Sequence, residues 1–194
     1  SVPPSDAQTE TEADAQRPAN HRYYFDTGVG DWTGTFTFAI TDRQAFQADS
    51  IGLVNRLLVI VMASVIGIVG RATITSHLAG FPDEAPAGVV TNEVRISLWG
   101  ITLYLLLEEY VMHPDGRGVT VVSKERFGPV PKVFTRRKAH PAEVVDEGRR
   151  AIYYMPLLGT DWVGRYEVSA DGNRIESVLT CDWGRGIEVI ERVD

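Results

Sequence analysis

The stretch GDWTGTFTFAI, residues 30–40, alternates between two kinds of side chain. Small or polar residues occupy one set of positions. The other set is mostly bulky and apolar and comprises Trp32, Gly34, Phe36, Phe38 and Ile40. A period of two is typical of a β-strand with one buried face. The stretch therefore predicts a half-buried strand that opens on an Asp-Trp pair.

A second stretch, TDWVGRYEVSA at residues 160–170, repeats this opening of Asp-Trp-x-Gly-x-aromatic. Two interpretations stay open. In the first, the repeat marks two similar corners of a barrel, each of which needs a capped turn, a bulky plug and a glycine where strands approach closely. In the second, Trp162 and Tyr166 face a ligand.

Strand patterns recur at short intervals along the rest of the chain. Turn-forming residues separate several of them, notably HPDG at 113–116 and ADGN at 170–173. Residues 128–134 are interpreted as the start of an irregular link and residues 141–150 as a helical turn. The expected strands after the first cover residues 70–78, 89–99, 101–112, 117–127, 150–157, 161–169, 174–182 and 186–193.

So many strands joined by short turns indicate an all-β fold. An open sheet of this size leaves edges that invite aggregation, so closure into a barrel is favoured. We predict a single antiparallel β-barrel of about 8–9 strands over residues 21–194, with its first strand paired to its last. A barrel of this size holds either packed side chains or one small ligand.

A helical pattern interrupts the strands at residues 43–63, where apolar side chains recur at spacings of three and four after a cap at Thr41 or Asp42. We expect it to form a lid over the barrel. The uncharged run at 57–70 is too short to span a bilayer, which takes about 20 apolar residues. No integral membrane span is predicted; buried core is expected, with contact to a membrane surface as the alternative.

The segment GDWTGTF resembles the Gly-x-Trp signature of lipocalins and their relatives in the calycin superfamily. In those barrels the Trp plugs the closed end beside an Arg from a late strand. The resemblance implies Trp32 as the plug and Arg185 or Arg192 as its partner. Helices after the first strand resemble the lid of the fatty-acid-binding branch. The last strand departs from that branch, because Glu188 and Ile190 stand where an Arg-x-Tyr anchor for a ligand carboxylate is expected.

Composition narrows the classes of function and partner. A net charge of −7 and a pI near 5.1 argue against nucleic acid, and the basic cluster 136–138 is expected to be a solvated turn. Residues 1–20 are rich in acids, prolines and small side chains and are predicted to be a disordered arm. The chain contains one cysteine, Cys181, for which a buried structural role is expected, and a cytoplasmic location is favoured.

No cofactor or metal is expected, because no two histidines stand at ligand spacing and no nucleotide-binding motif is present. His77 is interpreted either as a residue that enters the cavity or as an exposed one. The oligomeric state is left unpredicted.

Two glutamates interrupt the apolar strand LYLLLEEYVM, residues 103–112. Alternation places Glu108 and Glu109 on opposite faces, and Glu108 shares its face with aromatic residues. If that face lines the lumen, burial raises the pKa of Glu108 and suits it to act as an acid or base. In the alternative, the strand end has already emerged into solvent.

The leading hypothesis for function is a binding protein that holds a small apolar or amphipathic ligand in the barrel lumen. The alternative is an enzyme on the same barrel, an isomerase or cyclase of an apolar substrate, with Glu108 or a lumen tyrosine as acid or base. A packed lumen with a purely structural role is the third possibility. Aromatic side chains supply apolar contact area. The predicted ligand-binding residues are Phe36, Phe38, Tyr104, Tyr110, Tyr154, Trp162 and Tyr166.

Overall fold

The computed structural model describes residues 25, 28–81, 88–114, 118–128, 130, 133–141, 143–145 and 149–193. The predicted arm at residues 1–20 lies outside this part of the chain. Eleven strands and two helices are described here. Their bounds are β1 Gly30–Ile40, α3 Arg43–Ala48, α4 Leu53–Val69, β2 Ala72–Phe81, β3 Val89–Leu98, β4 Ile101–Met112, β5 Gly118–Phe127, β6 Val133–Pro141, β7 Glu143–Val145, β8 Arg150–Leu157, β9 Thr160–Val168, β10 Arg174–Thr180 and β11 Gly184–Arg192.

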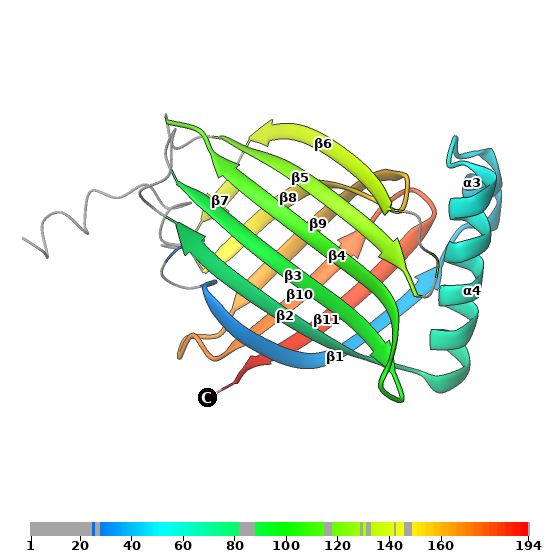
Figure 1. Cartoon of the computed structure of the whole chain (residues 1–194), viewed down its shortest axis with the longest axis horizontal. Helices are drawn as coiled ribbons and strands as arrows, with labels where there is room; N and C mark the ends of the chain where they lie inside the picture. Colours follow the sequence, from blue (N-terminus) through cyan, green and yellow to red (C-terminus); the bar gives the residue numbers. More distant parts are fainter. Residues whose placement is uncertain are drawn as a thin grey trace, which may run out of the picture.

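The strands form one sheet of eleven, in the order β6-β5-β4-β3-β2-β1-β11-β10-β9-β8-β7. Every pairing is antiparallel, and the sheet curls on itself into a nearly closed barrel (Figure 1). β1 pairs with β11, which confirms the predicted join between the first strand and the last. The two ends of the sheet are β6 and β7, and β5 and β6 approach β8 where these ends meet. The predicted all-β barrel with a helical lid is confirmed.

Two strands exceed the expected number. Residues 133–141 form β6, which pairs with β5, and residues 143–145 form β7, which pairs with β8. The interpretation of 141–150 as a helical turn is therefore wrong for 143–145, and the basic cluster 136–138 lies within β6 instead of a turn. Neither segment carries a strong period of two, so the pairing partner decides the conformation here, as is common for strands.

The helical segment begins as the sequence predicts and ends later. Asp42 caps α3, its Oδ1 accepting hydrogen bonds from the backbone N–H groups of Gln44 (2.8 Å) and Ala45 (2.9 Å). α4 continues to Val69, beyond the expected end near residue 63, and stops at Gly70, whose φ of 89° suits glycine. Despite the β-branched residues within 65–69, Ile66 extends the buried face of the helix by one more turn.

α4 lies across one end of the barrel (Figure 1). It buries Val59, Met62 and Ile66 there. Its opposite face stays open, with Leu53 73% and Ile68 85% exposed, so the expectation of buried core holds for one face only. Within the described part of the chain, no helix has both the length and the hydropathy needed to cross a membrane.

Trp32 lies at the start of β1, at the end of the barrel away from α4. Its side chain is 1% exposed, and its Nε1 donates a hydrogen bond to the carbonyl of Gly28 (2.9 Å). The guanidinium of Arg192 lies over the indole, 4.6 Å from the ring centroid, and donates to the carbonyl of Val29 (2.9 Å). Arg192, the cross-strand partner of Trp32, is thus the arginine beside it, whereas Arg185 is exposed.

Candidate functional site

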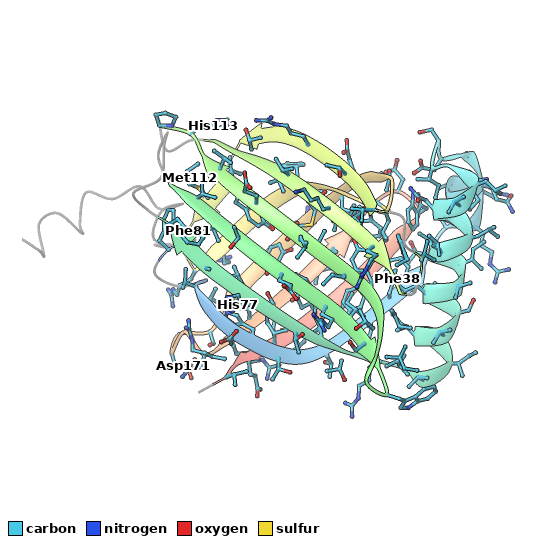
Figure 2. The ribbon with its side chains drawn as sticks, viewed as in Figure 1. Phe38, His77, Phe81, Met112, His113 and Asp171 are labelled. Atoms are coloured by element: carbon cyan, nitrogen blue, oxygen red, sulfur yellow. The ribbon has the colours of Figure 1, made fainter. Side chains whose placement is uncertain are left out.

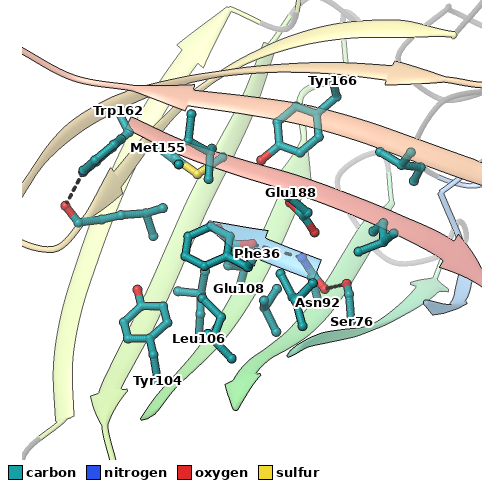
Figure 3. A pocket seen from close by; sticks show the side chains of 18 of the residues that line it. Phe36, Ser76, Asn92, Tyr104, Leu106, Glu108, Met155, Trp162, Tyr166 and Glu188 are labelled. Carbon is teal, nitrogen blue, oxygen red and sulfur yellow. Dashed lines mark hydrogen bonds between the residues drawn. The ribbon is translucent and has the colours of Figure 1, made fainter. Parts of the chain in front are cut away.

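A cavity of about 100 Å³ lies inside the barrel, between the Trp32 end and α4. Inward-facing side chains from strands on both sides of the barrel line it (Figure 3). Met62 of α4 contributes from the lid. Most of these side chains are apolar. Six of the seven predicted ligand-binding residues line the cavity: Phe36, Phe38, Tyr104, Tyr110, Trp162 and Tyr166.

Tyr154 is the seventh, and its predicted position is wrong. Its neighbour Met155 lines the cavity and stands opposite Trp162, so Tyr154 points to the other face of β8, where it is partly exposed. Successive residues of a strand face opposite sides, and an error of one residue in phase moves a side chain from the lumen to the surface.

Aromatic side chains fill the end of the cavity nearest the helices, where Phe38 lies beside α4 (Figure 2). Trp162 packs edge-on against Trp183, with ring centroids 5.2 Å apart, and donates from Nε1 to the carbonyl of Leu157 (3.1 Å). Trp183 in turn donates to Asp49 Oδ2 (2.6 Å) and so ties the α3–α4 link to the barrel. Sequence reasoning missed Trp183, which lies in the turn before β11 and belongs to no alternating pattern.

A chain of hydrogen-bonded polar side chains crosses β2, β3 and β4 on the inner face (Figure 3). Ser76 Oγ donates to Asn92 Oδ1 (2.7 Å), and Asn92 Nδ2 donates to Glu108 Oε2 (3.1 Å). Tyr110 Oη donates to the same oxygen of Glu108 (2.7 Å). Ser76 and Asn92 were not predicted; their signal in the sequence is a polar residue at an inward-facing position among apolar ones.

Glu108 is buried, with 5% of its surface exposed, while Glu109 faces outward and is exposed. The strand end therefore has not emerged into solvent at Glu108. Burial raises the pKa of Glu108 from 4.5 to about 7, although the hydrogen bonds from Tyr110 and Asn92 favour the charged form and oppose this rise. Its Oε1 is buried and has no hydrogen-bond partner within the described residues.

A second acid, Glu188, enters the cavity from β11. It is 8% exposed, and its Oε2 accepts a hydrogen bond from Ser177 Oγ (2.8 Å). Burial raises its pKa, and its charge adds to the rise in the pKa of Glu108. No lysine, arginine or histidine is among the described residues that line this cavity, so nothing there neutralises the two acids.

Glu125 is a third buried acid, 1% exposed, and it lies behind the cavity wall. Its Oε1 accepts from Tyr104 Oη (2.7 Å) and from the backbone N–H of Leu158 (2.6 Å). Leu158 has a φ of 50°, which is uncommon for a residue with a side chain. Glu125 thus holds the turn after β8 in place and orients Tyr104, whose pKa is raised by burial and by this neighbour.

The remaining candidates lie outside the cavity. His77 is on the outer face of β2 (Figure 2), where its Nδ1 is 2.6 Å from Asp31 Oδ1. Of its two interpretations, the exposed residue is confirmed and the cavity residue is wrong. Burial raises the pKa of the half-buried Cys181 thiol to about 11, which keeps it protonated near neutrality. The described residues contain no group of three or more side chains placed to hold a metal ion.

A scan of protein-family models finds none that matches this chain, and searches of curated proteins and of solved structures find no match either. The geometry of the cavity is therefore the basis for a proposal about function.

Proposed function

We propose that this chain is a lipocalin-like binding protein that holds a small apolar or amphipathic ligand in its lumen. The observation that carries the proposal is the cavity itself, a space inside the barrel lined by apolar and aromatic side chains with a few convergent polar groups. This combination is characteristic of small-molecule sites. Packed cores, by contrast, contain few voids larger than a water molecule.

Two further features agree with a calycin-like architecture. The stacking of Arg192 on Trp32 at one end matches the plug that the Gly-x-Trp resemblance implies. The position of α4 over the other end matches a lid. Glu188 lines the lumen where the fatty-acid-binding branch would carry a basic anchor, so a fatty acid is a poor candidate for the ligand.

The size of the cavity limits the ligand. A space of about 100 Å³ is smaller than the engineered apolar cavities of about 150 Å³ that bind benzene. A ligand with one substituted ring therefore requires the side chains of the cavity wall to move outward. A longer ligand requires α4 to move, because Met62 of that helix forms part of the cavity wall.

A second candidate function rests on Glu108. Its pKa of about 7 and its contact with Tyr110 suit proton transfer at neutral pH within an apolar cavity. An isomerase or cyclase would use such a group. Such an activity would exchange a C–H proton of the ligand for deuterium from deuterated water. The Glu108→Gln variant is expected to lose this exchange.

The experiment for ligand binding compares two neighbouring residues on β4. Leu106 is buried and lines the cavity, whereas Leu107 faces outward and is 41% exposed. Calorimetric titration with ethylbenzene is expected to show one site in the unmodified protein and in Leu107→Trp, and none in Leu106→Trp, because the larger ring fills the cavity. Absence of binding to the unmodified protein, or binding that survives in a folded Leu106→Trp, contradicts the proposal.

A further inference from the structure

The hydrogen bonds on one wall of the cavity engage one carboxylate oxygen of Glu108 and not the other. Asn92 uses its carbonyl to accept from Ser76 and its amide to donate to Glu108. Tyr110 donates to the same oxygen, Oε2. These bonds hold the carboxyl group of Glu108 in one orientation, and Oε1 has no partner among the residues that the structure describes.

A buried acceptor without a partner is costly, because folding removes its hydrogen bonds to water and replaces them with nothing. Glu108 also lines the cavity, so a bound molecule can reach its side chain. A ligand that carries a hydrogen-bond donor would therefore supply a partner for Oε1. A ligand carboxylate offers only acceptors when ionised and cannot fill this role.

The opposite wall adds a second acid. Figure 3 shows Glu108 and Glu188 entering the cavity from different strands, and the charge of Glu188 raises the pKa of Glu108. Buried charges are normally paired, because removing a lone charge from water is costly. Arg192, which shares β11 with Glu188, lies over Trp32 and is not among the residues that line the cavity. A positive charge on the ligand would supply the missing counterion.

We propose that the ligand is a small apolar amine, whose ammonium group is held by Glu108 Oε1 and faces Glu188. This proposal rests on the proposed binding of a ligand in the lumen. An ammonium group provides three donors and a positive charge. An alcohol supplies a donor but leaves the acids without a counterion. The apolar part of the ligand lies against the aromatic side chains at the α4 end, notably Phe38 and Trp162, which line the same cavity.

The test uses four probes that share one apolar body: phenylethylamine, phenylethanol, phenylacetate and ethylbenzene. Calorimetric titration at neutral pH is expected to give about tenfold tighter binding of the amine than of ethylbenzene, since hydrogen bonds to charged groups are the stronger ones. The alcohol falls between these two probes. Phenylacetate binds most weakly, because its carboxylate meets two acids.

Glu108→Gln is expected to remove the preference for the amine over ethylbenzene, since the glutamine side chain has the same shape but carries no charge. Glu109→Gln is the matched control, because it makes the same change in charge at the next residue on the exposed outer face. Thermal melting establishes that each variant folds. Glu188→Gln is the second variant and is expected to weaken the amine preference without abolishing it.

The outcomes separate the two proposals. If ethylbenzene binds and the amine binds no more tightly, the amine assignment is wrong and lumen binding stands. If the amine preference survives in both Glu108→Gln and Glu188→Gln, these acids do not form its site. If the alcohol binds more tightly than the amine, the role of the ligand charge is wrong. If none of the four probes binds, lumen binding itself fails.

Discussion

The two Asp-Trp segments share more than their sequence. Trp32 and Trp162 are 1% and 2% exposed, and each donates from Nε1 to a carbonyl earlier in the chain. Each is followed two residues later by a glycine with no room for a Cβ atom, Gly34 in β1 and Gly164 in β9. In both strands the motif has the same structural role: it holds an indole in the core where the strand begins.

The neighbours of the two indoles differ. Trp32 lies beneath a cation, Arg192, and is not among the residues that line the cavity. Trp162 lies beside another indole, Trp183, and forms part of the cavity wall. The first motif therefore acts as a plug, while the second combines structural anchoring with a place in the candidate site. The local sequence determines that each indole is buried, whereas the neighbouring strands determine which residues it contacts.

Truncation of either tryptophan gives the largest expected loss of stability, and the two variants differ in ligand affinity. Trp32→Ala and Trp162→Ala each remove a buried indole and are expected to lower the free energy of unfolding by about 3–5 kcal/mol. Where the variants remain folded, only Trp162→Ala changes ethylbenzene affinity. Denaturant unfolding followed by calorimetry checks both. A near-unchanged midpoint for Trp32→Ala would remove that indole from the core.

The cavity around Trp162 also makes stability depend on pH, through Glu108. Its pKa is about 7 in the folded protein against an ordinary 4.5, so the folded state binds this proton more tightly than the unfolded state. The stabilisation is complete below pH 4.5, declines as the pH rises toward 7 and is lost above it, and it amounts to about 3 kcal/mol.

The check is the difference in unfolding free energy between the unmodified protein and Glu108→Gln, measured from pH 4 to 8. As the pH rises from 4 to 8, the unmodified protein should lose about 3 kcal/mol of unfolding free energy relative to the glutamine variant. Glu109→Gln, on the exposed face, should track the unmodified protein. A constant difference for Glu108→Gln would mean that the carboxyl group titrates alike in both states.

The two glycines offer a sharper contrast. A Cβ on Gly34 would overlap the backbone carbonyl of Val189, and the β1–β11 pair would have to separate to accommodate it. A Cβ on Gly164 would meet the ring of Tyr166 at 2.6 Å, and a side chain yields more easily than backbone. Gly34→Ala is expected to cost about 3 kcal/mol and Gly164→Ala about 1 kcal/mol in thermal unfolding. Equal costs would contradict this difference between the two strands.

The smallest effects come from conservative changes. Trp32→Phe loses a hydrogen bond and the stronger cation–π partner of Arg192, at about 1–2 kcal/mol. Trp162→Phe loses one hydrogen bond to a carbonyl, at about 1 kcal/mol, and also enlarges the cavity. Ethylbenzene titration should therefore respond to Trp162→Phe alone. A response of the same size to Trp32→Phe would mean that the region around Trp32 also influences ligand binding, and would contradict the separation of the two regions.

Alternation predicted much of this arrangement. The period of two in β1 placed Trp32, Phe36 and Phe38 on the buried face, and the same rule selected Glu108 over Glu109 for the lumen. These strands have one face packed against the core, so their pattern is strong. Tyr154 shows the limit of the rule, because the phase of β8 is set by the pairing of its neighbour Met155 with Trp162.

Features that depend on distant partners escaped prediction. β6 becomes a strand by pairing with β5, and its own residues carry little pattern. The link from Asn92 to Ser76 and Glu108 requires the register of three strands, which periodicity does not supply. α4 ran past its expected end because packing of Ile66 against the barrel outweighs the low helix propensity of its β-branched residues.

The central claim is that the lumen beside Trp162, and not the plug beside Trp32, holds the ligand. Crystals grown with a brominated phenylethylamine test this most directly, because anomalous scattering locates the bromine without reference to the protein. We expect one strong peak inside the barrel, against Phe38 and Trp162, with the amine directed toward Glu108. A peak beside Trp32 or on the outer face of α4, with none in the lumen, would contradict it.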